Sequence, residues 1–294
     1  MNNELAAIMA AILAEEEDEL IRRQVPRQNI TPQQEEPSPE PGALPNVESA
    51  TLLLDLQADE FALSDNDPVA TWADQSGNGR DFTQADATAK PTYKAAVEGY
   101  PAVFFNQVIE PDFFPQWLQG PKFANNLSSF AIFIVSKYDL EQSYNDNIIA
   151  KQFDDLSTGW RFAQNSFSDP VLTDLLGAIC IDNENDLEIA IDKETGDAFS
   201  LGTIEFLARD TTNVYINGDN TGQFDAVRLG TVGDISNDEF VYLGGTTRNI
   251  FDNWFCFSGW IRAVVMYEIT DLVNWPTDRA AIDAWLAARY GITL

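Results

Sequence analysis

The most constraining feature of the sequence is its end, where a long strand pattern precedes a single helix pattern. Residues 259–268 are apolar at nearly every position. A strand that is apolar on both faces is typical of the middle of a packed sheet. Strict alternation divides its side chains into two sets: Ile261, Ala263, Val265 and Tyr267 on one face, and Trp260, Arg262, Val264, Met266 and Glu268 on the other.

One helix is predicted after this strand, starting at Thr277. Thr277 is a suitable N-cap, and Asp278 would lie near the positive end of the helix dipole. Gly291 can end the helix in a left-handed conformation. We expect the helix to cover the sheet or to close its open end. Its apolar residues recur at helical spacing: Ile282, Trp285, Leu286 and Tyr290.

From residue 51 onward the chain contains short strand-like runs that are separated by Gly, Asn, Asp and Pro. This spacing predicts an all-β, two-sheet antiparallel sandwich of the jelly-roll type. We see no internal repeat. The runs are residues 51–58, 102–105, 130–137, 147–153, 160–163, 175–181, 187–191, 201–209, 214–217, 240–244 and 259–268.

The charge and composition exclude several functions. With 17 basic and 47 acidic residues the net charge is −30, which repels phosphate backbones and anionic membranes, so we expect neither nucleic-acid nor membrane binding. The chain has no histidine, which excludes Ser-His and Cys-His nucleophiles and His-ligated zinc. We expect no cofactor and no metal ion. Cys180 and Cys256 lie in apolar runs and are interpreted as buried thiols, although pairing between them is not readable from sequence.

The amino-terminal part predicts an anchor and a tether. Residues 1–23 form an amphipathic helix pattern that is too short to span a bilayer and lacks the features of a signal peptide. Residues 24–47 contain six prolines and predict an extended linker before a head domain at 48–294. An exposed apolar stripe favours self-association, with a trimer preferred over a dimer or a particle-bound single copy. The stripe consists of Leu5, Ile8, Met9, Ile12 and Leu13.

The segment from Asp74 to Gly79 is dense in turn-forming residues. It partly matches the spacing of a calcium-binding loop. The twelfth position is Ala85 instead of Glu, however, which argues against an EF-hand. We therefore interpret this segment as a structural turn.

Several segments in a fixed order resemble the concanavalin A-like, laminin-G-like jelly-roll family over residues 50–294. The resemblance implies two antiparallel sheets face to face, with glycans bound at loops on one end or on the concave sheet. Similar domains occur in bacteriophage virion proteins, where a short amino-terminal segment fixes the domain to the particle. The matching segments are Trp72-Ala-Asp-Gln-Ser-Gly-Asn-Gly79, Gly99-Tyr-Pro-Ala-Val-Phe104, Asn213-Val-Tyr-Ile-Asn-Gly218, Leu243-Gly-Gly245, and Gly259 to Tyr267 with the helix that ends Arg289-Tyr-Gly-Ile292.

Two loops combine aromatic rings with Asp or Asn, which is the chemistry of sugar recognition. A pyranose stacks its apolar face on a ring while its hydroxyls bond to oxygens and amides. Packing under a long loop, or a contact between copies, is the alternative for either loop. The candidate glycan-binding residues are Asp112, Phe113, Phe114 and Trp117 in the first loop and Asp252, Asn253 and Trp254 in the second.

A possible catalytic pattern is the acidic strand Glu184-Asn-Asp-Leu-Glu188, because some β-glucanases of this fold carry E-x-D-x-E. Asn185 replaces an aliphatic residue of that motif, and the residues after Glu188 differ from it. We therefore assign no catalytic residue. The sequence favours a non-enzymatic virion protein, a decoration or fibre protein at the particle surface that contacts other virion proteins through its amino-terminal segment. A polysaccharide hydrolase or a secreted carbohydrate-binding protein is the alternative.

Overall fold

The structure is a computed structural model in which one compact unit spans Pro41–Leu294. Residues 1–42 lie outside the described residues. They include the predicted linker up to residue 42 and the predicted anchor helix with Leu5, Ile8, Met9, Ile12 and Leu13. Leu44 and Val47, at the end of the predicted linker, pack against the sandwich. In the part of the chain that is described, no helix is long and apolar enough to cross a membrane. The structure describes residues 43–108, 114–139, 146–151, 158–164, 176–181, 186–191, 198–208, 211–220, 227–228, 235–245 and 256–294.

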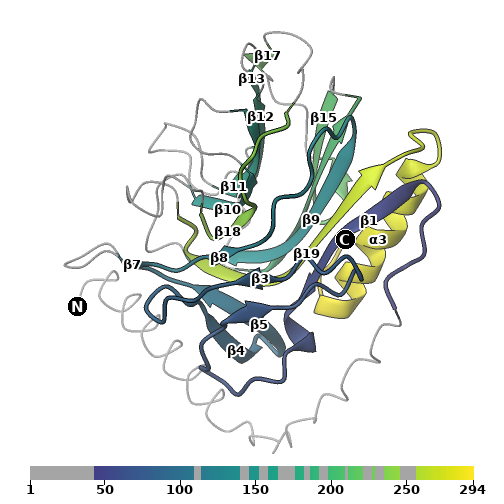
Figure 1. Cartoon of the computed structure of the whole chain (residues 1–294). Helices are drawn as coiled ribbons and strands as arrows, with labels where there is room; N and C mark the ends of the chain where they lie inside the picture. Colours follow the sequence, from purple (N-terminus) through teal and green to yellow (C-terminus); the bar gives the residue numbers. More distant parts are fainter. Residues whose placement is uncertain are drawn as a thin grey trace, which may run out of the picture. The chain divides into compact units, whose positions relative to one another are not determined.

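Two antiparallel sheets and one carboxy-terminal helix make up the described fold, which confirms the predicted class (Figure 1). A short 3-10 helix, η1 (Ala58–Glu60), follows β1, and α3 (Trp275–Tyr290) follows β19. The eight-stranded sheet has the order β16 (Asp219–Asn220), β15 (Thr211–Ile216), β14 (Ser200–Leu207), β9 (Phe130–Tyr138), β19 (Gly259–Ile269), β5 (Tyr100–Phe105) and β4 (Thr92–Val97), and β1 (Ala50–Gln57) pairs with β19. The nine-stranded sheet has the order β17 (Val227–Arg228), β13 (Asp186–Ile191), β12 (Leu176–Ile181), β11 (Gly159–Gln164), β10 (Asp146–Lys151), β18 (Tyr242–Leu243), β8 (Leu118–Gln119), β3 (Phe82–Thr83) and β2 (Thr71–Trp72). β6 (Gln107–Val108) and β7 (Phe114–Pro115) form a separate two-stranded sheet.

β19 lies in the middle of its sheet, as predicted, and pairs with β1, β5 and β9. The predicted assignment of its side chains to the two faces of the sheet is wrong at one end of the strand. A register irregularity between Ile261 and Ala263 interrupts the alternation, so Ile261 faces the sandwich core together with Val264 and Met266. Trp260 then packs on the helix side of the sheet. A β-bulge adds one residue to a strand and reverses the side-chain directions beyond it.

The helix α3 begins earlier than predicted. Asn274, not Thr277, is its N-cap residue, and a proline in the first turn fixes the backbone there. Asp278 accepts hydrogen bonds from the backbone N–H of Ser49 (3.1 Å) and from its hydroxyl (2.6 Å), so it ties the helix to the start of β1. Gly291 ends the helix in the left-handed region, as predicted, with φ of 67°.

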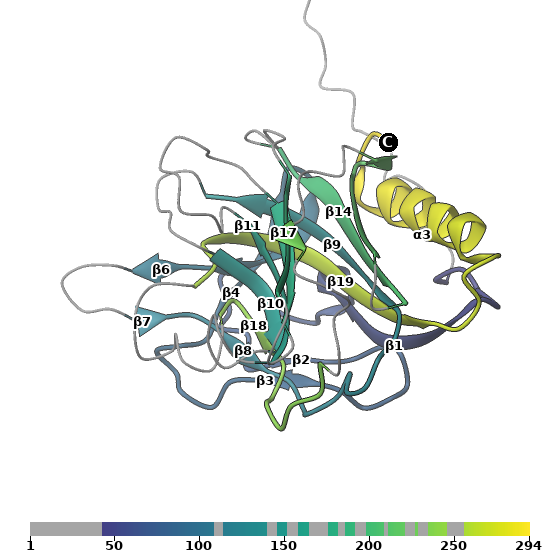
Figure 2. The same cartoon turned by 90° about the horizontal axis from the view of Figure 1, so that it is seen from above.

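The buried apolar residues form two clusters on opposite sides of the eight-stranded sheet. The larger cluster fills the space between the two sheets and includes Trp72, Phe105 and Phe162. The smaller cluster lies between the eight-stranded sheet and α3, which covers the outer face of that sheet (Figure 2). Of the four apolar residues that recur at helical spacing in α3, Ile282, Leu286 and Tyr290 are buried and Trp285 is half buried. Cys256 is buried, and the side chain of Cys180 lies outside the described residues.

The turn that begins at Asp74 has a structural role, which agrees with its interpretation from sequence. The carboxylate of Asp74 accepts hydrogen bonds from the backbone N–H groups of Asp55, Ser76 and Arg80, each at 3.0 Å. Leu53 lies at a register irregularity in β1, and its carbonyl accepts a hydrogen bond from Arg80 Nη1 at 2.6 Å. The turn therefore satisfies backbone groups that a bulge removes from the ladder.

Candidate ligand-binding site

The first predicted glycan-binding loop is described only in part. Asp112 and Phe113 lie outside the described residues, and of Phe114 only the backbone, in β7, is described. Trp117 is half buried, with its ring 5.6 Å from the ring of Tyr242. This contact is packing of the kind that the sequence left as the alternative for this loop. A role of the loop in sugar binding stays a prediction.

The second predicted loop, with Asp252, Asn253 and Trp254, lies wholly outside the described residues, as does Glu184. Asp186 and Glu188 are in β13, where Asp186 pairs with Ile181 and Glu188 with Ile179. Their side chains are outside the described part of the chain. The expectation that this acidic strand has no catalytic role therefore stays a prediction.

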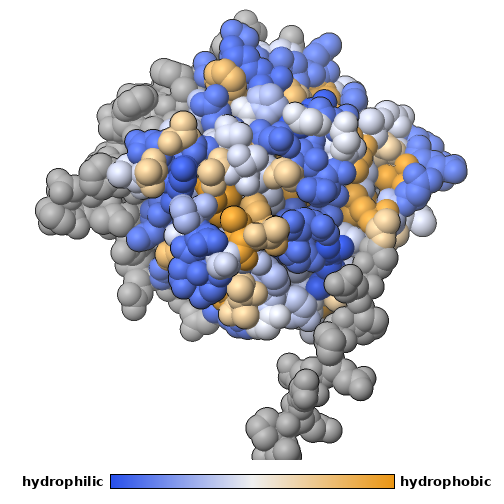
Figure 3. All heavy atoms as spheres, turned by 60° about the horizontal axis from the view of Figure 1, so that its bottom comes forward, coloured by the Kyte–Doolittle hydropathy of each residue, from blue (hydrophilic) through white to orange (hydrophobic). Residues whose placement is uncertain are grey.

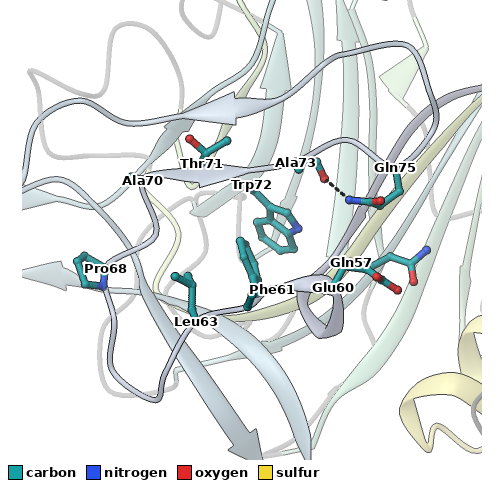
Figure 4. Close-up of a pocket in the computed structure, with 11 residues that line it drawn as sticks. Gln57, Glu60, Phe61, Leu63, Pro68, Ala70, Thr71, Trp72, Ala73 and Gln75 are labelled. Atoms are coloured by element: carbon teal, nitrogen blue, oxygen red, sulfur yellow. Dashed lines mark hydrogen bonds between the residues drawn. The ribbon is translucent and has the colours of Figure 1, made fainter.

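A pocket of about 330 Å³ lies where β1 and η1 meet β2 (Figure 4). We call it the Phe61–Trp72 pocket. Small-molecule sites in proteins are clefts of roughly 300–1,000 Å³, so its size is that of a small binding site. It is lined by Gln57, Glu60, Phe61, Ala62, Leu63, Pro68, Ala70, Thr71, Trp72, Ala73 and Gln75.

The floor of the pocket is aromatic. Trp72 is buried, with 1% of its surface exposed, and it belongs to the sandwich core. Phe61 is half buried and lies over Trp72 with ring centroids 5.5 Å apart; the ring of Tyr93 is also 5.5 Å from Phe61. The two contacts hold the Phe61 ring in one orientation and leave part of it accessible. A ring fixed in this way is a platform on which an apolar face can stack.

The rim of the pocket is polar. Thr71 and Gln75 are exposed, and the Gln75 amide donates a long hydrogen bond (3.3 Å) to the Ala73 carbonyl. Glu60 is exposed at the end of η1, and its Oε1 accepts a 2.8 Å hydrogen bond from Arg289 Nη2. The rim therefore offers an amide and a carboxylate beside the Phe61 ring. The Thr71 side chain points to the opposite side of β2 from Trp72 (Figure 4).

The carboxy-terminal end of α3 holds η1 in place. Arg289 Nε donates to Asp59 at 2.7 Å, and the Tyr290 hydroxyl donates to the other Asp59 oxygen at 3.0 Å. Arg289 thus contacts both acidic residues of η1. Helix α3 thereby fixes the side of the pocket that carries Glu60, although it is far from η1 in the sequence.

A buried acid and amide lie next to the pocket. Asp55, 5% exposed, accepts hydrogen bonds from Gln57 Nε2 at both carboxylate oxygens (2.7 and 3.0 Å). The pKa of Asp55 is raised from 3.8 to about 6, chiefly by burial; the hydrogen bond from Gln57 acts to lower this pKa, and the nearby Asp74 acts to raise it. Gln57 Oε1 and Trp72 Nε1 have no hydrogen-bond partner among the described residues. These groups support the pocket wall from behind and carry unused hydrogen-bonding capacity.

The surface on the side of β3, β4 and β5 combines apolar and hydrophilic regions. When this side is turned forward, apolar residues gather in a small central area that hydrophilic residues surround (Figure 3). Leu63 and Phe61, both half buried, pack against the sandwich core.

This pocket was not predicted from the sequence. Phe61 is the one aromatic residue in the acidic run from Asp59 to Asp67, and this isolated ring was the available signal. Trp72 was noted only as part of a family-like segment. The pocket also depends on Arg289 and on Gln57, whose proximity follows from the fold and not from spacing in the sequence.

No family model matches the chain, and no curated protein matches its sequence. Solved structures do match it. Domain 4 of AbnA, a GH43 extracellular arabinanase from Geobacillus stearothermophilus solved in complex with arabinotriose, is 13% identical with a TM-score of 0.53, over 81% of this chain and 99% of that domain. The botulinum neurotoxin serotype D binding domain is 16% identical with a TM-score of 0.50, over 79% of this chain and 50% of that one. The chain shares their β-sandwich fold. At these identities the likeness concerns the fold alone.

Proposed function

We propose that this protein is a non-enzymatic carbohydrate-binding protein whose ligand occupies the Phe61–Trp72 pocket. The observation that carries the proposal is the combination of an accessible ring, Phe61, with a polar rim in a pocket of about 330 Å³. The apolar C–H face of a sugar stacks on such a ring, and its hydroxyls bond to the polar groups around it.

The fold likeness supports the same class of ligand. The AbnA domain, which shares the fold over almost its whole length, was solved with arabinotriose bound. The place where that domain binds its sugar does not locate a site in this chain. The likeness supports a carbohydrate as ligand, and the pocket residues supply the location.

The composition of the pocket supports binding without hydrolysis. Glycoside hydrolysis uses two carboxyl groups that flank the scissile bond. Glu60 is the one carboxylate side chain among the described lining residues, and Arg289 contacts it. Asp55 is buried behind the wall and engaged by Gln57.

We further propose that the sandwich is displayed on a bacteriophage virion as a decoration or fibre protein. The support is the resemblance of residues 50–294 to virion-borne jelly-roll domains, together with the amphipathic pattern of residues 1–23 and the proline-rich residues 24–47. In this proposal the amino-terminal segment joins three copies or attaches them to other virion proteins. Several heads on one particle gain avidity for a repeated surface glycan.

A glycan array probed with the full-length protein tests the carbohydrate-binding function and its location. We expect binding to defined glycans, and a loss of at least about tenfold in affinity for Phe61→Ala, because stacking on the ring is removed. Trp260→Ala is the matched control, since Trp260 is also a half-buried ring but packs on Phe104 outside the pocket. Loss of binding in Trp117→Ala instead of Phe61→Ala would move the site to the first predicted loop.

A further inference from the structure

We infer that the Phe61–Trp72 pocket selects neutral sugars and rejects acidic ones, such as uronic and sialic acids. This inference rests on the proposed carbohydrate-binding function and adds the class of sugar. Its basis is the distribution of charge around the pocket. Among the described residues that line the pocket, Glu60 is the one ionisable side chain, and none is basic.

The groups next to the lining add further negative charge. Asp59 precedes Glu60 in η1 and is exposed, and Asp55 lies behind the wall beside Gln57. A ligand carboxylate in the pocket would therefore approach Glu60 and Asp59, and Arg289, which pairs with both, offsets only part of their negative charge. The net charge of −30 over the whole chain adds a longer-range repulsion of the same sign.

The cation that contacts the rim, Arg289, is already engaged. Arg289 pairs with Asp59 at 2.7 Å and with Glu60 at 2.8 Å, and its side chain is only 13% exposed. Its guanidinium also lies 5.0 Å from the centre of the Trp285 ring. An acidic ligand that used Arg289 would have to break the contacts that hold η1 against α3. Arginine is therefore present near the site as a structural group and not as an anion receptor.

A neutral sugar meets no such penalty. The hydrogen bond from Arg289 occupies Oε1 of Glu60, which leaves Oε2 as an acceptor for a sugar hydroxyl. The Gln75 amide supplies a further partner, because the hydrogen bond that it makes to Ala73 is long and easily replaced. Uncharged hydroxyls suit both of these rim groups.

Matched pairs of sugars test the inference on the full-length protein. Oligomers of glucose and galactose are compared with oligomers of glucuronic and galacturonic acid of the same linkage, and arabino- and xylo-oligosaccharides complete the neutral set. We expect each neutral member that binds to bind at least about tenfold more tightly than its acidic counterpart at about 10 mM ionic strength. The difference should shrink at about 150 mM ionic strength, because salt screens the repulsion at an exposed rim.

Variants separate charge from shape. Glu60→Gln keeps the size of the rim side chain and removes its charge, so it should reduce the difference between neutral and acidic members several-fold. Gln75→Ala, the control, removes an uncharged rim group and should weaken both members equally. Equal or tighter binding of the acidic members, or a difference that neither salt nor Glu60→Gln alters, overturns the inference and leaves carbohydrate binding intact. Absence of binding to every sugar overturns both the inference and the proposed function.

Discussion

Trp275 Nε1 donates a 2.7 Å hydrogen bond to the buried carboxylate of Glu205, which joins the first turn of α3 to the neighbouring strand β14. The same carboxylate also accepts hydrogen bonds from Asn213 and from the Tyr215 hydroxyl, both at 3.1 Å, and forms an ion pair with Arg279. A buried carboxylate is tolerated only when such donors satisfy it. The helix is therefore fixed to the sheet at its start by Glu205 and at its end by Arg289.

Replacing Trp275 with Phe removes one of these donors and keeps most of the packing. We expect the free energy of unfolding to fall by about 1–3 kcal/mol, because a hydrogen bond to a buried charged group is lost. Chemical denaturation measured by tryptophan fluorescence and circular dichroism checks this value. Trp260→Phe is the control and should change stability by about 0.5 kcal/mol or less. Equal effects of the two variants would contradict the role of the Glu205 hydrogen bond.

Asp55 should make stability depend on pH in an identifiable window. Its pKa is raised from 3.8 to about 6 in the folded protein, so the folded state holds the proton more tightly than the unfolded state does. The resulting stabilisation is complete below about pH 4 and is lost as the pH rises through about 6. The Asp55→Asn variant lacks this pH-dependent stabilisation.

The measurement for Asp55 is the free energy of unfolding of both proteins between pH 4 and pH 7. Relative to Asp55→Asn, the unsubstituted protein should lose up to about 3 kcal/mol across this range, since one pKa unit corresponds to about 1.4 kcal/mol. Parallel pH profiles of the two proteins would show that Asp55 titrates at its ordinary pKa.

Asp74 should be important for folding and not for ligand contact. Its carboxylate accepts three backbone hydrogen bonds, including one from Asp55 in β1. We expect Asp74→Ala to lower the free energy of unfolding by at least about 2 kcal/mol, because the freed N–H groups lose a charged acceptor. Glu48→Ala, which removes an exposed carboxylate elsewhere, should change stability by about 0.5 kcal/mol or less. A small effect of Asp74→Ala would mean that the turn holds its shape without this side chain.

The amino-terminal stripe predicts an oligomer. Light scattering on the full-length protein should give the mass of a trimer, and the double variant Ile8→Glu with Ile12→Glu should give a monomer, because charge in the stripe prevents its burial. The head carries its own core, so circular dichroism and thermal unfolding of the sandwich should be unchanged. A monomer in both cases at physiological salt would leave assembly to the particle itself.

Local sequence patterns predicted much of the fold. The apolar run at 259–268 predicted the central strand β19, and Gly291 predicted the end of α3. The bulge at Ile261 was not predictable, because nothing in the sequence distinguishes it from regular alternation. The start of α3 was missed because Asn274 takes the capping position without a side-chain cap bond, and Asp278 bonds to Ser49 across the chain.

The candidate site was less accessible to sequence reasoning than the fold. The two glycan-binding loops are predicted because aromatic and polar residues are neighbours in the sequence there, as around Trp117. The Phe61–Trp72 pocket instead combines residues from β1, η1 and β2, and Arg289 from α3 positions its rim. Such a site depends on tertiary contacts, so composition alone reveals only single members, such as the isolated ring of Phe61.

The most direct test of the account is a crystal structure of the full-length protein with a bound neutral oligosaccharide from the array. We predict electron density for a sugar ring stacked on Phe61, with hydroxyls within hydrogen-bonding distance of Glu60 or Gln75. Sugar density elsewhere, with the Phe61–Trp72 pocket empty at saturating ligand, would contradict it.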